Sequence, residues 1–157
     1  GVIRVGTLSK ALGAAGGFVV GSSSLIQWLA NRARTYVFST AQPAAVSSAA
    51  IAALDIVAQE PQRRTGLLSA ASKLRSTLRH QGWNTGLSAS QIIPIVIGSP
   101  SEALRLSESL RRQGYWVPAI RPPSVPEGES LLRLSLTAAH TPEMIEGLLE
   151  ALGNADH

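Results

Sequence analysis

The sequence of 157 residues contains no cysteine, which excludes a disulfide framework and any metal site built on thiolates. This absence is compatible with a reducing compartment, and we expect a cytoplasmic protein. Aromatic residues make up only 4% of the chain, and they are not interleaved with a cluster of basic residues as in many RNA-binding surfaces. We therefore expect no metal site and no nucleic acid partner.

Acidic residues are absent from residues 1–54, although this segment holds Arg4, Lys10, Arg32 and Arg34. The rest of the chain holds ten basic and ten acidic residues, so the whole net charge of +4 arises in the first third. A basic segment without acids suits an anionic partner such as a phosphate. The alternative is that its acidic neighbours lie elsewhere in the protein.

Two long stretches carry no charge at all, residues 11–31 and 35–54. Each is long enough to raise the question of a membrane span. Both contain Ser and Gln, the first also contains Gly and the second Pro43, and large aliphatic side chains do not dominate either of them. We therefore expect both stretches to be buried inside a large protein, with no membrane as a partner.

The apolar pattern predicts an α/β fold. We expect strands at residues 2–6, 17–21, 92–97, 115–120 and 131–137, and helices at residues 23–34, 43–59, 61–81, 100–113 and from 142 onward. Residues 36–40 are expected to be extended or loop. The helix after Pro43 is apolar nearly all round, which predicts that it is buried. Ser99 and Glu102 have the spacing of a capping box. A domain boundary is expected after residue 58, which gives domains 1–58 and 59–157.

A single lysine, Lys10, lies in the Gly- and Ala-rich stretch TLSKALGAAGG at residues 7–17. A lysine that attacks a carbonyl must be partly desolvated, so that its amine is neutral often enough to react. The hydroxyls of Thr7 and Ser9 and the backbone N–H groups around them could hold a phosphate. Pyridoxal 5'-phosphate (PLP) requires both features. The alternative is an ordinary lysine beside a glycine turn.

The stretch TLSKALGAAGG resembles the PLP lysine motif of the α-oxoamine synthases, which belong to the fold-type I, aminotransferase-like superfamily. YVFSTAQP at residues 36–43 resembles the segment of this family that reaches the cofactor phosphate of the neighbouring subunit. Residues 113–141, which contain AIRPPSVP and LRLSLTAAH, resemble the C-terminal domain of the member from the biotin pathway. The resemblance implies the end of a large PLP domain followed by a small C-terminal α/β domain, in a homodimer whose subunits share the active site.

The resemblance also implies roles for the residues near the lysine. Lys10 would carry the cofactor and later move the α-proton of the substrate. Thr7 would bond the cofactor phosphate, and Ser39 and Thr40 would contact the phosphate of the partner subunit. Many relatives carry Tyr where this chain has Phe38, so a hydroxyl contact is missing at that position.

The second group of candidates lies near the C-terminus. Alternation along LLRLSLT at residues 131–137 places Arg133 on the face opposite its leucine neighbours. A guanidinium there suits a bidentate grip on an amino-acid carboxylate, although a solvated arginine on a sheet face would give the same pattern. The resemblance adds Ser124 as a substrate contact. Arg121 would either contact the carboxylate of the acyl chain or cap its loop.

By resemblance, the reaction is the decarboxylative condensation of L-alanine with pimeloyl-CoA or with a pimeloyl carrier protein. A sister enzyme that uses glycine, of the glycine C-acetyltransferase or 5-aminolevulinate synthase type, is the nearest alternative. Two further alternatives are not enzymes: an inactive partner subunit, and an anion-binding module that uses the basic first third.

The start of the chain suggests a fragment, because it opens at Gly1 on what reads as a strand. A PLP enzyme needs an acid beside the pyridine nitrogen, and the first acid here is Asp55, within an apolar helix. The family supplies an Asp and two His upstream of its lysine. We therefore expect the fragment alone to be inactive.

Overall fold

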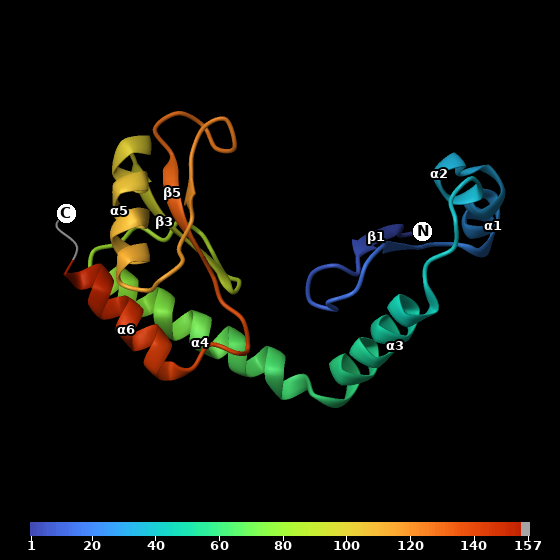
Figure 1. Cartoon of the computed structure of the whole chain (residues 1–157), viewed down its shortest axis with the longest axis horizontal. Helices are drawn as coiled ribbons and strands as arrows, with labels where there is room; N and C mark the ends of the chain where they lie inside the picture. The colour runs from blue at the N-terminus through green and yellow to red at the C-terminus, as the bar shows by residue number, and fades with distance from the viewer. Residues whose placement is uncertain (155–157) are drawn as a thin grey trace. The chain divides into compact units, whose positions relative to one another are not determined.

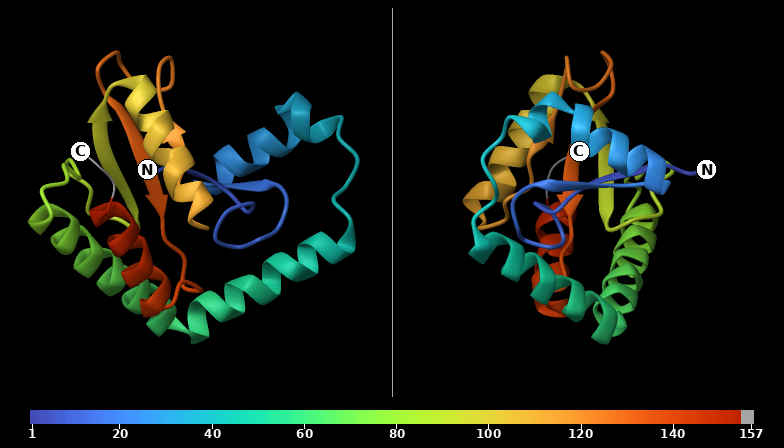
Figure 2. Two further views of the ribbon diagram at one scale, coloured as in Figure 1. Left: turned by 60° about the vertical axis from the view of Figure 1, so that its left-hand side comes forward. Right: turned by 90° about the vertical axis from the view of Figure 1, so that its right-hand side faces the viewer.

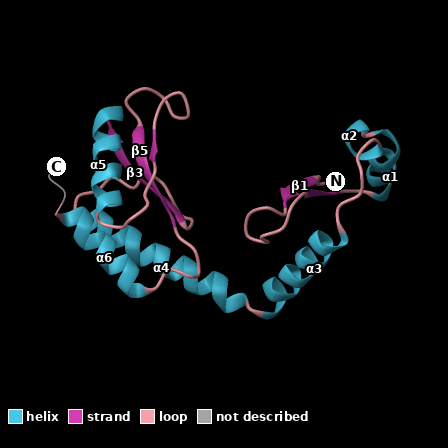
Figure 3. Cartoon of the chain, viewed as in Figure 1, coloured by secondary structure: helices cyan, strands magenta, loops and turns pink. Residues whose placement is uncertain are grey.

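A computed structural model describes residues 1–154 of the chain. The chain divides into two compact units, Gly1–Pro61 and Gln62–His157. The boundary expected from the sequence lies a few residues before this division. Figure 1 follows the elements of both units along the chain, and Figure 3 distinguishes the helices from the strands.

The first unit is a hairpin followed by helices. Strand β1 (Arg4–Thr7) pairs antiparallel with β2 (Gly17–Val20), and the helices are α1 (Ser23–Arg32), α2 (Arg34–Val37) and α3 (Ala44–Gln59). Helix α1 begins after Ser22, whose hydroxyl accepts the N–H of Leu25 at 3.3 Å. The sequence predicted no helix at residues 36–40, and this is wrong at its start because α2 extends to Val37.

Burial in the first unit differs from the expectation. Strands β1 and β2 are exposed along nearly their whole length, and Ala50 is the only buried residue described in α3, the helix that was expected to be buried. Ile51 of this helix is 62% exposed. The physical reason is that a two-stranded ladder has no second layer within this unit, so the apolar side chains that the pattern marks have nothing to pack against.

The second unit is a sheet covered by helices. Its elements are α4 (Pro61–His80), β3 (Ile92–Gly98), α5 (Pro100–Arg112), β4 (Ala119–Ile120), β5 (Ser130–Ser135) and α6 (Pro142–Gly153). The strands form an antiparallel sheet in the order β3-β5-β4. Figure 2 shows these elements from two further sides.

One core lies between the helices and one face of this sheet. Ile93, Ile95, Leu132 and Leu134 point into it from the strands and are at most 4% exposed. The helices contribute the rest of the central core: Ala71, Leu74 and Leu78 from α4, Leu106 and Leu110 from α5, and Ala151 and Leu152 from α6. The predicted alternation of β5 is confirmed, and the other face of the sheet stays open.

Local signals place the helix starts as expected. The Ser99 hydroxyl accepts the Glu102 N–H at 3.4 Å, and the Thr141 hydroxyl accepts the Met144 N–H at 3.3 Å. The strand predicted at residues 115–120 is reduced to Ala119–Ile120. Just before this strand, the Ser107 hydroxyl of α5 donates a hydrogen bond to the Val117 carbonyl at 2.6 Å. Within the described residues, no helix is both long enough and apolar enough to cross a membrane.

Candidate active site

Lys10 lies in the loop that joins β1 to β2. The loop is closed by backbone hydrogen bonds from the Leu8 N–H to the Gly16 carbonyl at 3.0 Å and from the Ala14 N–H to the Leu8 carbonyl at 2.9 Å. The carbonyl of Lys10 itself accepts the Gly13 N–H at 3.0 Å. Gly13 has φ +60° and Gly16 φ +93°, which favour glycine at both turns. The backbone therefore holds Lys10 in a defined loop, with its side chain exposed.

Two hydroxyl groups lie beside the lysine in the same loop. The Thr7 and Ser9 hydroxyl oxygens are 2.8 Å apart, and the Thr7 hydroxyl accepts the Ser9 N–H at 3.1 Å. Thr7 Oγ1 also donates to the Gly16 carbonyl at 3.3 Å. A primary amine and two hydroxyls thus come from four consecutive residues. This donor set fits a ligand that carries both a carbonyl group and a phosphate.

The segment with Ser39 and Thr40 connects α2 to α3. The Ser39 hydroxyl donates to the Tyr36 carbonyl at 3.0 Å, and Ser39 and Thr40 are both exposed. Further along this segment, the side chain of Gln42 approaches the lysine loop, because a Cβ added to Gly16 would lie 3.3 Å from Gln42 Nε2. Sequence reasoning missed Gln42, since its position beside Gly16 depends on the path of the chain between them.

Arg133 lies on the open face of the sheet in the second unit. It is exposed, whereas its neighbours Leu132 and Leu134 are buried on the opposite face. Its backbone N–H donates to the Pro118 carbonyl at 3.0 Å, and Pro94 lies directly across from it on β3. The guanidinium is therefore carried by the central strand of the sheet and faces away from the core.

Arg121 and Ser124 lie in the loop between β4 and β5. The Ser124 N–H donates to the Arg121 carbonyl at 3.0 Å, which closes a turn, and both side chains are exposed. Arg121 follows Ile120, which pairs with Leu131, so it lies toward the Gly98 end of the sheet, away from Arg133. The structure thus describes two groups of candidates, one in each unit.

His140 makes local contacts that connect β5 to α6. Its Nδ1 accepts the Thr137 N–H at 2.9 Å and lies 3.1 Å from the Thr137 hydroxyl. These bonds fix the chain just after β5 and before α6. No group of His, Cys, Asp and Glu suited to a metal ion is found among residues 1–154.

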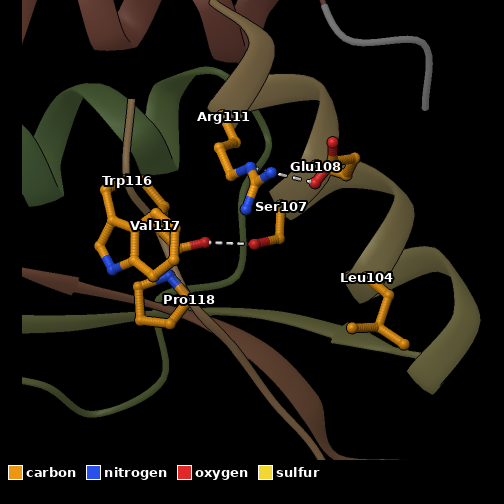
Figure 4. A pocket seen from close by; sticks show the side chains of 7 residues that line it. All are labelled: Leu104, Ser107, Glu108, Arg111, Trp116, Val117 and Pro118. Atoms are coloured by element: carbon orange, nitrogen blue, oxygen red, sulfur yellow. Dashed lines mark hydrogen bonds and ion pairs between the residues drawn. The ribbon is translucent and has the colours of Figure 1, made fainter. Parts of the chain in front are cut away.

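A hollow of about 360 Å³ lies between α5 and residues 116–118. Figure 4 shows Trp116 and Arg111 at its rim, with Leu104 on the side of α5. The Arg111 guanidinium lies 5.9 Å from the centre of the Trp116 ring, and it pairs with Glu108 at 3.4 Å. None of the candidate residues lines this hollow, so we assign it no part in the site.

The relatives found by comparison with known proteins agree with one another. A model of the family described as aminotransferase class I and II matches residues 1–152. The chain is 51% identical over 150 residues to the 8-amino-7-oxononanoate synthase of Thioalkalivibrio sulfidiphilus, covering 96% of this chain and 38% of the relative. It is 46% identical over 151 residues to the 8-amino-7-oxononanoate synthase of Chromobacterium violaceum, covering 96% and 39%.

The backbone of the chain is also similar to that of a solved structure. A high-resolution structure of SPT with a PLP internal aldimine is similar with a TM-score of 0.90 at 30% identity, over 96% of this chain and 38% of that one. The chain thus spans about two fifths of the length of these relatives.

Proposed function

Because the chain belongs to the family of class I and II aminotransferases, we propose that it is part of a PLP-dependent acyltransferase of the 8-amino-7-oxononanoate synthase type. The predicted membership of the aminotransferase-like α/β group is confirmed by the family match and by the likeness to SPT. The relatives at 46% and 51% identity carry the name of this enzyme. The single observation that carries the proposal is the lysine loop, with Lys10, Thr7 and Ser9 next to one another.

The donor set of the loop supports PLP as the cofactor. The Lys10 amine would hold the aldehyde carbon, and the Thr7 hydroxyl would bond the phosphate. Ser39 and Thr40 would contact the phosphate of a second subunit in a homodimer. When bound, PLP withdraws electrons from the α-carbon of an amino acid and so makes its proton removable. Residues 1–54 contain no carboxylate that could face the pyridine nitrogen.

The proposed reaction joins L-alanine to a pimeloyl thioester. A bond forms between the α-carbon of alanine and the thioester carbonyl, the C–S bond breaks, and the thiol leaves. The alanine carboxylate departs as carbon dioxide, and a proton takes its place to give 8-amino-7-oxononanoate. The thiol belongs either to CoA or to a carrier protein.

The candidate side chains divide the tasks of this reaction among them. Lys10 Nζ removes the α-proton of alanine and later returns a proton to the same carbon. The Arg133 guanidinium holds the alanine carboxylate through two parallel N–H···O bonds until decarboxylation. Ser124 and Arg121 contact the acyl substrate. Arg121 suits the free carboxylate of the pimeloyl chain, because a guanidinium pairs with a carboxylate in the same way.

Borohydride reduction tests the cofactor assignment. The longest chain that the parent gene encodes is incubated with PLP, reduced and digested, and the labelled peptide is mapped by mass. Residues 1–157 contain only Lys10 and Lys73, so Lys73→Arg is a matched control that should keep the label while Lys10→Arg loses it. An unlabelled Lys10 in a folded protein would contradict the proposal and favour an inactive subunit or an anion-binding module.

Product analysis tests the substrates. With L-alanine and pimeloyl-CoA or a pimeloyl carrier protein, the mass of 8-amino-7-oxononanoate should appear together with carbon dioxide. Turnover of glycine in place of alanine would instead assign the chain to a sister enzyme of the same family.

A further inference from the structure

The side chain of Gln42 lies against the lysine loop that joins β1 to β2. A Cβ added to Gly16 would lie 3.3 Å from Gln42 Nε2 and 3.8 Å from Gln42 Cδ. Gly16 has φ +93° and no side chain of its own, so the amide of Gln42 can come this close to its backbone. A side chain from the segment before α3 thus packs on the loop that carries Lys10.

Gly16 is the residue on which the lysine loop closes. Its carbonyl accepts the Leu8 N–H at 3.0 Å and the Thr7 hydroxyl at 3.3 Å. Thr7 is the residue that we propose to bond the cofactor phosphate, and Lys10 follows it in the same loop. A side chain that limits the movement of Gly16 therefore also limits the movement of the lysine and of the Thr7 hydroxyl.

Gln42 belongs to a short segment, residues 38–43, that is held at both ends. At its start, the Ser39 hydroxyl and the Ser39 N–H both donate to the Tyr36 carbonyl of α2, at 3.0 Å and 3.3 Å. At its end, Pro43 is the N-cap of α3. A residue before a proline is biased toward extended backbone, so the backbone of Gln42 has little freedom to turn its side chain away from the lysine loop.

The same segment carries Ser39 and Thr40, which we propose to contact the phosphate of the cofactor held by the other subunit. Both side chains are exposed. Only Ala41 separates Thr40 from Gln42, so order imposed at one of these residues is passed to the other. The segment therefore connects two cofactor sites, because it touches the lysine loop of its own subunit and reaches the site of the second subunit.

We propose that Gln42 is a positioning residue that couples the two cofactor sites of the homodimer. This inference rests on the proposed function. A phosphate bound by Ser39 and Thr40 orders residues 38–43, and Gln42 passes this order to the lysine loop of its own chain. The second cofactor then binds a loop that has already lost part of its conformational freedom, which gives positive cooperativity. By reciprocity, the coupling has the same size in both directions.

The contact between Gln42 and Gly16 is one of packing. The Gly16 carbonyl already accepts two hydrogen bonds, and the Gly16 N–H is a donor just as Gln42 Nε2 is. Gln42→Ala removes the contact, and it should fold because the side chain is exposed. Gln42→Met keeps the length of the side chain and should keep the coupling. Gln27→Ala is the matched control, because Gln27 is an exposed glutamine of α1.

Mixed dimers of the longest chain that the parent gene encodes give the first test. One chain carries Lys10→Ala and Gln42→Ala together, and the other chain is unaltered, so borohydride traps PLP in the lysine loop only on the unaltered chain. The apparent affinity for PLP at that lysine should fall by about fivefold or more, the lower end of a typical coupling between two sites. The reference is a mixed dimer in which the first chain carries Lys10→Ala alone.

The outcomes of this test are distinct. Gln42→Met in place of Gln42→Ala should restore the affinity, because it restores the packing on Gly16. An affinity equal to that of the reference dimer would overturn the inference, since the altered Gln42 would then act on its own chain alone. Absence of label on Lys10 in the unaltered homodimer would count against the proposed function instead.

The second test is the binding curve of PLP to the homodimer, followed by absorbance and needing no turnover. The unaltered protein should bind with a Hill coefficient between about 1 and 2, the limits for two sites, and Gln42→Ala should lower it to about 1. Gln42→Met and Gln27→Ala should leave it unchanged. Independent binding in the unaltered dimer would overturn the inference, and so would cooperativity that survives in Gln42→Ala or binding of PLP to a monomer.

Discussion

Arg133 lies directly opposite Pro94 at a position where β5 and β3 exchange no backbone hydrogen bond. The Arg133 N–H donates to Pro118 on the other side of β5, and the N–H of Val96 points away from β5 toward Asn84. The backbone nitrogen of Pro94 therefore faces the edge of the sheet, where its missing N–H interrupts no ladder bond. Side chains at such a pair are close, so the proline ring restricts the space open to the guanidinium.

Replacing Arg133 by lysine should lower kcat/KM for alanine about 10- to 100-fold, because an ammonium group cannot form two parallel bonds to a carboxylate. The expected loss appears in steady-state kinetics with alanine varied at a saturating concentration of the thioester. Ser135→Ala is the control, since Ser135 shares the open face of β5 and carries no charge. A lysine variant as active as the control would remove Arg133 from the carboxylate site.

Local patterns predicted much of the second unit. The alternation along β5 and the cap at Ser99 depend on neighbours within a few residues, and the structure confirms them. The shortness of β4 was not predicted, because the Val117 carbonyl accepts a hydrogen bond from a serine of α5 that lies ten residues earlier. The hydrogen bonds from Arg75 and Arg79 of α4 to the loop before β3 likewise join segments whose proximity depends on the tertiary path of the chain.

The first unit shows what the apolar pattern of a sequence cannot predict. The apolar stretches of β1, β2 and α3 have the composition of buried elements, but a pattern cannot say which layer covers them. The motif around Lys10 could be identified from the sequence because its residues are contiguous. The approach of Gln42 to Gly16 was not, because a long segment separates the two residues.

Two glycines of the second unit should respond in opposite directions to alanine. Gly82 follows α4 with φ +90°, and no atom would crowd an added Cβ, so Gly82→Ala should destabilise the protein by about 1 kcal/mol through backbone strain alone. Gly66 lies inside α4 with equally open space and no positive φ. Gly66→Ala should stabilise by up to about 1 kcal/mol through helix propensity. Urea denaturation of both variants measures the difference, and equal effects would contradict the argument.

Two buried hydroxyls should also differ in their contribution to stability. The Ser130 hydroxyl is fully buried and, within the described residues, has no hydrogen-bond partner, so Ser130→Ala should leave the free energy of unfolding unchanged or raise it by up to about 1 kcal/mol. Thr85 is 1% exposed and accepts Arg79 Nε at 2.8 Å. Thr85→Val should cost about 1 kcal/mol because it removes this hydrogen bond. Denaturant unfolding compares the two, and a Thr85 variant as stable as the parent would refute the contribution of this bond.

Glu143 in the first turn of α6 should titrate below its ordinary range. The hydrogen bond from the Thr141 side chain lowers the pKa of its carboxyl group, and the backbone N–H of Glu143 acts in the same direction. A carboxyl group whose pKa is lowered by folding contributes stability above its unfolded pKa and loses this contribution as the pH falls through the folded pKa. Thr141→Val should raise the Glu143 pKa, whereas Thr141→Ser, which keeps the hydroxyl, should leave it lowered. Carboxyl titration by NMR measures both, and an unchanged pKa in Thr141→Val would show that the side-chain bond does not cause the shift.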